Sequence, residues 1–126
     1  MTVRAMIVDD NVEFLGTARC LLEREGITVV GVASTGAEAL RSAEEHNPDV
    51  VLVDVDLGEE SGFDVAERLN PATGRRRRVV LISADPEQDF EDLIDASAAI
   101  GYVSKARLSA SAIVELLDRQ GRTDRT

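Results

Sequence analysis

Short apolar runs rich in β-branched residues alternate with segments of helical spacing, and this alternation restricts the possible folds more than any other feature. The runs are Val3–Val8, Ile27–Val32, Val50–Val55, Val79–Ile82 and Tyr102–Val103. The third run is almost continuously apolar, which is typical of a strand covered on both faces of a parallel sheet. Repeated alternation with right-handed crossovers therefore predicts an α/β domain, with a parallel sheet between two layers of helices.

The segments between the runs carry helix signals. One apolar stripe, at offsets near three and four residues, consists of Phe14, Leu15, Ala18, Leu21 and Leu22. Residues suited to cap helix N-termini stand at Thr35, Ser61, Asp85 and Ser109. These signals predict helices in the intervals between the predicted strands.

Length and composition favour one globular domain. The chain has 126 residues, and we expect a domain at 1–119 with a polar C-terminal tail at 120–126. The formal net charge of −10 argues against direct nucleic-acid binding, which needs cations to displace counterions. No apolar run approaches the ~20 residues of a membrane span and no signal-peptide pattern is present, so we expect no membrane partner and a cytoplasmic location. Cys20, the single cysteine, lies among apolar residues and is expected to be buried.

Polar side chains follow the predicted strands at their carboxyl ends. They are Asp9 and Asp10 after the first strand, Asp54 and Asp56 at the third, Ser83 at the fourth and Lys105 after the fifth. Ligands of open α/β sheets bind at this edge. Taken singly, a pair of aspartates is usually a solvated turn, a strand-end aspartate a helix cap, and such a lysine exposed. Their joint occurrence at one edge indicates a site.

The combination of groups indicates phosphoryl chemistry. Carboxylates brought together in a partly buried crevice repel one another, and a divalent cation would relieve that repulsion. Mg2+ suits such a site, because it prefers oxygen ligands and combines one or two carboxylates with a phosphate oxygen. A lysine ammonium and a serine hydroxyl can bind further phosphoryl oxygens. The set is what in-line transfer of a phosphoryl group to a carboxylate requires.

The chain resembles the response-regulator receiver family of two-component signalling, in the CheY-like superfamily. The matching segments are MIVDD at 6–10, VVLVDVDL at 50–57, Gly62, LISA at 81–84 and GYVSK at 101–105. As a set with this spacing they are specific, and they extend from Val3 to about Leu117. The resemblance implies a flavodoxin-like (βα)5 three-layer sandwich with the strand order 2-1-3-4-5, for which the CheY receiver is a standing example.

The resemblance also implies roles for the acidic residues. Asp54 corresponds to the phosphoacceptor, and Asp10 to the main carboxylate ligand of Mg2+. Asp9 would assist through water, and the backbone carbonyl of Asp56 would complete the metal site. Lys105 corresponds to the lysine that binds the phosphoryl group.

Two further residues correspond to the family's switch. Ser83 would move toward the phosphoryl group, and Tyr102 would turn inward behind it. The surface formed by the fourth helix, the fifth strand and the fifth helix would then change. An exposed strand-end tyrosine is the plainer interpretation of Tyr102.

The chain departs from the family's pattern at two positions. Gly58 stands where many receivers have proline, so we expect a more flexible loop after Asp54. Ala106 stands where a cis-forming proline is common, and we expect a trans bond there because a cis bond before alanine would cost roughly 3 kcal/mol. Asp56 and Asp85 add negative charge beside the site, which we expect to alter the lifetime of the phosphoryl group.

The family resemblance implies a phosphoacceptor rather than an enzyme, with a sensor histidine kinase or a histidine phosphotransfer protein as donor. The output would be a downstream protein or an output domain. Alternatives are an N-terminal receiver fragment of a DNA-binding regulator, and a pseudo-receiver that binds partners without phosphorylation. A haloacid-dehalogenase-type phosphatase has a DxD motif like Asp54-Val-Asp56, but on its first strand. The run Arg75–Arg78 is a solvated loop or a docking patch for an acidic partner.

Overall fold

The computed structural model describes residues 3–70, 77–84 and 99–124, with side chains described as far as Asp118. The expected cap at Asp85, the expected fourth helix and the first half of the arginine run lie outside these ranges. The elements are β1 (Arg4–Val8), α1 (Val12–Arg24), β2 (Thr28–Ala33), α2 (Gly36–His46), β3 (Val50–Asp54), β4 (Asp56–Leu57), β5 (Glu60–Ser61), α3 (Gly62–Leu69), β6 (Val79–Ser83), β7 (Gly101–Ser104), the short 3-10 helix η1 (Lys105–Arg107) and α5 (Ala110–Asp124).

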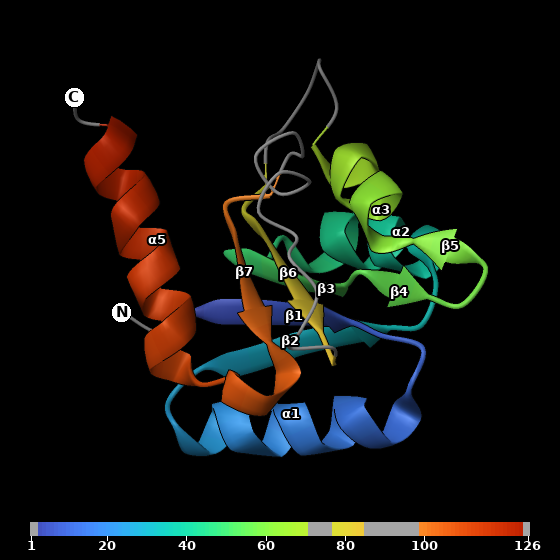
Figure 1. The fold of residues 1–126 in the computed structure, drawn as a ribbon, viewed down its shortest axis with the longest axis horizontal. Helices are drawn as coiled ribbons and strands as arrows, with labels where there is room; N and C mark the ends of the chain where they lie inside the picture. Colours follow the sequence, from blue (N-terminus) through green and yellow to red (C-terminus); the bar gives the residue numbers. More distant parts are fainter. Residues whose placement is uncertain (1–2, 71–76, 85–98, 125–126) are drawn as a thin grey trace.

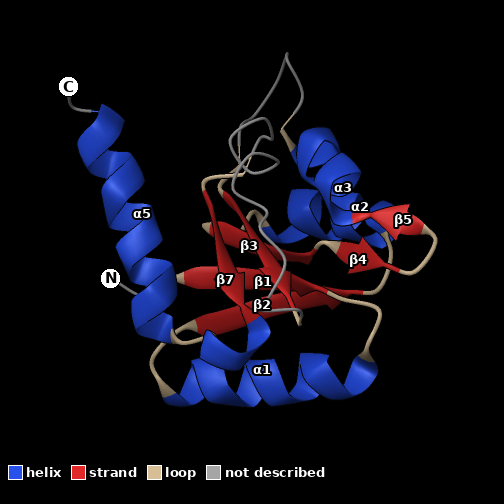
Figure 2. Cartoon of the chain, viewed as in Figure 1, coloured by secondary structure: helices blue, strands red, loops and turns tan. Residues whose placement is uncertain are grey.

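A five-stranded sheet forms the centre of the molecule (Figure 1). Its strand order is β2-β1-β3-β6-β7, and every pair of neighbours is parallel. Counted along the chain within this sheet, the order is 2-1-3-4-5, so the predicted flavodoxin-like topology is confirmed. Helices cover the sheet on both sides, as Figure 2 shows.

Two separate apolar cores hold the layers together. The α1–α5 core contains Leu15, Ala18, Leu22, Ile113 and Leu117 with alternate residues of the strands, such as Val50 and Leu52. The α2–α3 core contains Ala39, Ala43, Val65, Ala66 and Leu69 with the intervening strand residues, such as Val51 and Val53. All five residues of β3 are buried. The expectation of a strand covered on both faces is therefore correct, because successive side chains of β3 enter opposite cores.

Three of the predicted helix caps are in place. The side chain of Thr35 accepts a hydrogen bond from the Glu38 amide at 3.2 Å. The hydroxyls of Ser61 and Ser109 accept hydrogen bonds from amides of their own first turns. These contacts satisfy amides at helix N-termini that have no partner within the helix.

One expectation about burial is wrong. Cys20 is exposed on α1. Leu15, Ala18 and Leu22 take the buried face of that helix, so an apolar neighbourhood in the sequence does not place Cys20 inside. The last helix, α5, continues to Asp124, so the residues from 120 that we expected in a polar tail are helical as far as Asp124. The domain boundary at residue 119 remains a prediction.

The segment after Asp54 forms a small antiparallel ribbon of β4 and β5 that the sequence pattern did not predict. Gly58 lies in its turn with φ of +73°, a left-handed conformation that favours glycine. Glu60 of the ribbon contacts both α2 and α3. Its carboxylate accepts a hydrogen bond from the Gly36 amide at 2.9 Å and lies 3.6 Å from the guanidinium of Arg68. The ribbon thus sets the path of the chain beside Asp54.

Candidate functional site

The carboxyl ends of neighbouring strands bring the predicted polar residues to one edge of the sheet. Val8, the last residue of β1, pairs with Val53, so Asp9 and Asp54 follow side by side. Asp54 pairs with Ile82, one residue before Ser83. Ser83 in turn pairs with Ser104, and Lys105 comes next. The parallel register alone therefore gathers Asp9, Asp54, Ser83 and Lys105.

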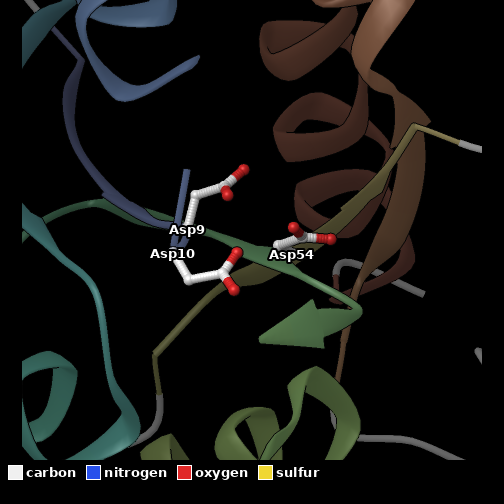
Figure 3. Close-up of side chains that lie close together, drawn as sticks. All are labelled: Asp9, Asp10 and Asp54. Carbon is white, nitrogen blue, oxygen red and sulfur yellow. The ribbon is translucent and has the colours of Figure 1, made fainter. Parts of the chain in front are cut away.

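Three aspartates form a compact acidic cluster at this edge (Figure 3). One carboxylate oxygen from each of Asp9, Asp10 and Asp54 lies within 4.8 Å of the others. Asp9 and Asp54 are 0% and 6% exposed, whereas Asp10 is exposed. The cluster is thus open to solvent on one side, where a ligand can enter, and closed on the other.

Backbone amides fix two of these carboxylates. Asp9 Oδ1 accepts a hydrogen bond from the Asn11 amide at 2.9 Å. Asp54 Oδ1 accepts one from the Asp56 amide at 3.1 Å. Each bond is made two residues along the chain, in a turn that aspartate favours. The second carboxylate oxygen of each residue is left to face the cluster.

Lys105 supplies the positive charge of the cluster. Its Nζ atom lies 2.6 Å from Asp9 Oδ2 and 3.1 Å from Asp54 Oδ2. Both contacts are ion pairs, and the contact with Asp54 also has hydrogen-bond geometry. The lysine side chain is 15% exposed. Among the described residues, the cluster combines three carboxylates with one ammonium, so the pocket keeps an excess of negative charge.

The environment shifts the pKa values of both partners upward. Burial raises the pKa of Asp54, and the negative charge of Asp9 adds to this, although the Asp56 amide and Lys105 act in the opposite direction. Burial alone would lower the pKa of Lys105. The close contacts with Asp9 and Asp54, and the negative charges of both, outweigh that effect, and the pKa of Lys105 is raised. Lys105 therefore stays charged at neutral pH.

The donor set fits a hard divalent cation. All three groups of the acidic cluster offer oxygen, as Mg2+ prefers. Asp9 Oδ2 is buried, and among the described residues it is paired with the Lys105 ammonium, so it still has a lone pair to offer. An added cation would also reduce the excess negative charge. The cluster is therefore one that could hold Mg2+.

The other predicted residues lie close to the cluster but in different settings. Ser83 is 5% exposed at the end of β6. Asp56 contributes its amide to Asp54, and its backbone carbonyl as a metal ligand stays a prediction. Tyr102 lies on β7 beside a surface cavity of about 440 Å³ that Val103, Arg107 and Leu116 also line. The peptide bond after Lys105 is trans, as expected.

Two residues make contacts at the site that the sequence analysis did not predict. Gly58 approaches Asp10 so closely that a Cβ atom there would lie 3.3 Å from Asp10 Oδ2. Phe14, which we assigned to the apolar stripe of the first helix, places its ring under the Lys105 ammonium, 4.4 Å from Nζ to the ring centroid. The apolar stripe predicted that Phe14 packs in the core, and nothing in the sequence around Phe14 indicated its contact with Lys105.

The raised pKa of Asp54 leads to a prediction about stability. Because the folded state raises this pKa, Asp54 stabilises the fold at pH below its ordinary value, and that contribution is lost as the pH rises through the folded pKa. In metal-free buffer at pH 7, Asp54→Asn should therefore unfold at a higher urea concentration than wild type. The difference should shrink as the pH falls through the pKa of Asp54. Urea unfolding with EDTA at pH 4 to 7 measures it.

The control for this prediction is Asp118→Asn, on the exposed side of α5. It should change the urea midpoint little across the same pH range. A wild-type protein that is more stable than Asp54→Asn at pH 7 without metal would contradict the pKa direction of Asp54.

Known proteins resemble the chain over most of its length. The response regulator receiver domain family matches residues 5–118. The response regulator GacA of Pseudomonas viridiflava is 33% identical over 82% of this chain and 48% of its own length. The polar-differentiation response regulator DivK of Brucella ovis is 35% identical over 83% of this chain and 85% of its own length.

A solved receiver structure has the same fold as this chain. The signal receiver domain of a modulated diguanylate cyclase from Desulfovibrio desulfuricans G20 is 30% identical, has a TM-score of 0.76, and matches over 94% of this chain and 93% of its own. The chain spans about half the length of several curated relatives that it matches. Within the described part of the chain, no helix combines the length and apolar character needed to cross a bilayer. The fold, the site and these matches together establish that the chain belongs to the response regulator receiver domain family of two-component systems.

Proposed function

We propose that this receiver domain accepts a phosphoryl group on the carboxylate of Asp54. The observation that carries the proposal is the position of Asp54 Oδ2, 3.1 Å from the Lys105 ammonium and within the acidic cluster. Receiver domains are signalling phosphoacceptors and generally not enzymes. In this proposal the chain nevertheless promotes its own phosphorylation and dephosphorylation, because its side chains stabilise the charge that develops on the phosphoryl group.

The metal ligands in this proposal are the carboxylates of Asp10 and Asp54, with Asp9 assisting and the backbone carbonyl of Asp56 completing the set. The acidic cluster supports this assignment through its oxygen donors and through the buried Oδ2 atom of Asp9, which is paired with Lys105 and keeps a lone pair for a metal ion. Bound Mg2+ would neutralise carboxylate charge and bind a phosphoryl oxygen. Removal of Mg2+ with EDTA should therefore suppress phosphorylation.

The transfer step needs a nucleophile, a donor and a cation. A carboxylate oxygen of Asp54 attacks the phosphorus atom of a phosphohistidine, and a P–O bond forms as the P–N bond breaks. The electron pair of the broken bond stays on the imidazole nitrogen, and Asp54 becomes an acyl phosphate. Lys105 pairs with the phosphoryl oxygens, and its raised pKa supports a permanent charge there.

The signal would leave the site through Ser83 and Tyr102. Ser83 is buried at the same sheet edge as Asp54, and Tyr102 lies on the adjacent strand beside the cavity next to α5. In the proposed switch, the Ser83 hydroxyl binds a phosphoryl oxygen and Tyr102 turns inward. The surface of the expected fourth helix, β7 and α5 then changes. A preference of a few kcal/mol between two conformations suffices for such a population shift.

The proposed donor is a sensor histidine kinase or a histidine phosphotransfer protein in the cytoplasm. Receiver domains act with such kinases and with output domains. GacA is named as a response regulator and is about twice the length of the matched region. We therefore propose that the output is either a separate protein or a domain joined to this one, without direct nucleic-acid or membrane contact by the receiver itself.

Intact mass spectrometry tests the phosphoacceptor directly. Wild-type protein incubated with acetyl phosphate and Mg2+ should gain the mass of one phosphoryl group, and Asp54→Ala should gain none. Asp64→Ala, on the neighbouring helix α3, is the matched control and should behave as wild type. A protein that stays at its original mass under these conditions, and with a histidine phosphodonor, would favour the pseudo-receiver instead.

A further inference from the structure

Within the part of the chain that the structure describes, the Lys105 ammonium contacts three partners, and one of them carries no charge. Two are the carboxylates of Asp9 and Asp54, at 2.6 and 3.1 Å from Nζ. The third is the ring of Phe14, whose centroid lies 4.4 Å from Nζ. An ammonium has three N–H donors, so two can point to the carboxylates while the remaining positive surface meets the face of the ring.

We propose that Phe14 is a positioning residue for phosphoryl transfer, which it serves by holding the Lys105 ammonium beside Asp54 through a cation–π contact. This inference rests on the proposed function of Asp54 and Lys105. Cations are attracted to the negative face of an aromatic ring within about 6 Å of its centroid, most strongly where water is excluded. The lysine side chain is only 15% exposed, so its contact with the ring is largely desolvated.

The structure holds the ring itself in place. Phe14 lies in the first turn of α1, and its amide donates a hydrogen bond to Asn11 Oδ1, the side chain that caps the helix. Its ring packs against the α1–α5 core. Asn11 follows directly after Asp9 and Asp10, so the acidic cluster and the aromatic ring are tied to the same helix start.

A neutral partner is useful because the charged partners change during the reaction. A metal ion held by the acidic cluster would share Asp9 with Lys105, and phosphorylation of Asp54 would remove its carboxylate charge. The ring is not altered by either event. Phe14 can therefore keep Lys105 at the site while its oxygen partners are exchanged for phosphoryl oxygens, and it does not compete with the phosphoryl group for charge.

The test compares Phe14→Leu, which keeps apolar packing without an aromatic face, with Phe14→Tyr, which restores the face. Initial rates of phosphorylation by acetyl phosphate with Mg2+ are measured by intact mass. We expect Phe14→Leu to be slower by about tenfold and Phe14→Tyr to lie within about twofold of wild type. In a Lys105→Met background the Phe14→Leu change should have no further effect, because the ring then has no cation to hold.

A second measurement does not depend on phosphorylation. In wild type the Lys105 Cε protons should resonate upfield in NMR because of the ring current of Phe14, and in Phe14→Leu they should return to ordinary values. Equal rates for wild type and Phe14→Leu, or an equal loss in the Lys105→Met background, would overturn the positioning role and leave the function of Asp54 intact. A wild type that gains no phosphoryl group would instead remove the function on which the role rests.

Discussion

Replacing Gly62 with alanine is expected to destabilise the domain by about 3 kcal/mol and to disturb the acceptor strand. A Cβ atom on Gly62 would lie 2.0 Å from the carbonyl oxygen of Asp54 and 2.7 Å from Val55 Cα. These are backbone atoms, which cannot rotate away as a side chain can. Either the start of α3 or the end of β3 must shift, and both are buried at this point.

The glycine is required here for space and not for an unusual backbone conformation, because Gly62 is not among the glycines with positive φ. Gly16 in α1 provides the opposite case, since a Cβ atom there meets nothing within 4 Å. Gly16→Ala should stabilise the protein by roughly 0.5–1 kcal/mol, as alanine does in an exposed helix. Urea unfolding of the two variants measures the change in the free energy of unfolding, which should have opposite signs in the two. A Gly62→Ala protein within about 1 kcal/mol of wild type would show that the contact relaxes easily.

Replacing Lys105 with methionine is expected to slow phosphorylation by about 10²- to 10³-fold, the effect of removing one preorganised electrostatic group from a transition state. Methionine keeps most of the length of the side chain and removes its charge. The loss leaves Asp9 Oδ2 buried without its ion pair and the acidic cluster without its cation. In metal-free buffer the variant should also be less stable, by about 2 kcal/mol.

Arg107→Met is the matched control, because Arg107 is an exposed cation in the same 3-10 turn. The substitution removes the same charge from the protein but leaves the acidic cluster and Lys105 unchanged. Rates of phosphorylation by acetyl phosphate, followed by intact mass, separate the two variants. If Lys105→Met were phosphorylated as fast as Arg107→Met, the role proposed for the lysine would be wrong.

The sequence predicted the sheet and its polar edge because both follow from repeated local patterns. A buried parallel strand such as Val50–Asp54 is visible as an apolar run, and its carboxyl end fixes where Asp54 lies. Helix caps such as Thr35 and Ser61 were also readable, since each acts within its own first turn. The strand order came from the family resemblance, because the alternation predicts a parallel sheet but not the order of its strands.

The remaining features depend on contacts between distant segments. The ribbon of β4 and β5 has strands of only two residues, too short to show a period of two. The contact of Phe14 with Lys105 joins the first helix to the turn after the last strand, and an apolar stripe does not reveal it. Cys20 was misjudged because its neighbours in the chain are apolar, whereas its position on the helix faces outward. The face of the helix on which a side chain lies decides whether it is buried, and the apolar character of its neighbours in the sequence does not.

The division of the interior into two cores places the acceptor pocket on a boundary. Lys105 and Phe14 belong to the side of the molecule packed by α1 and α5. The ribbon beside Asp54 belongs to the other side, because Glu60 fastens it to the first turn of α2. Any ligand that contacts both Lys105 and the ribbon would therefore connect the two helical layers across the end of the sheet.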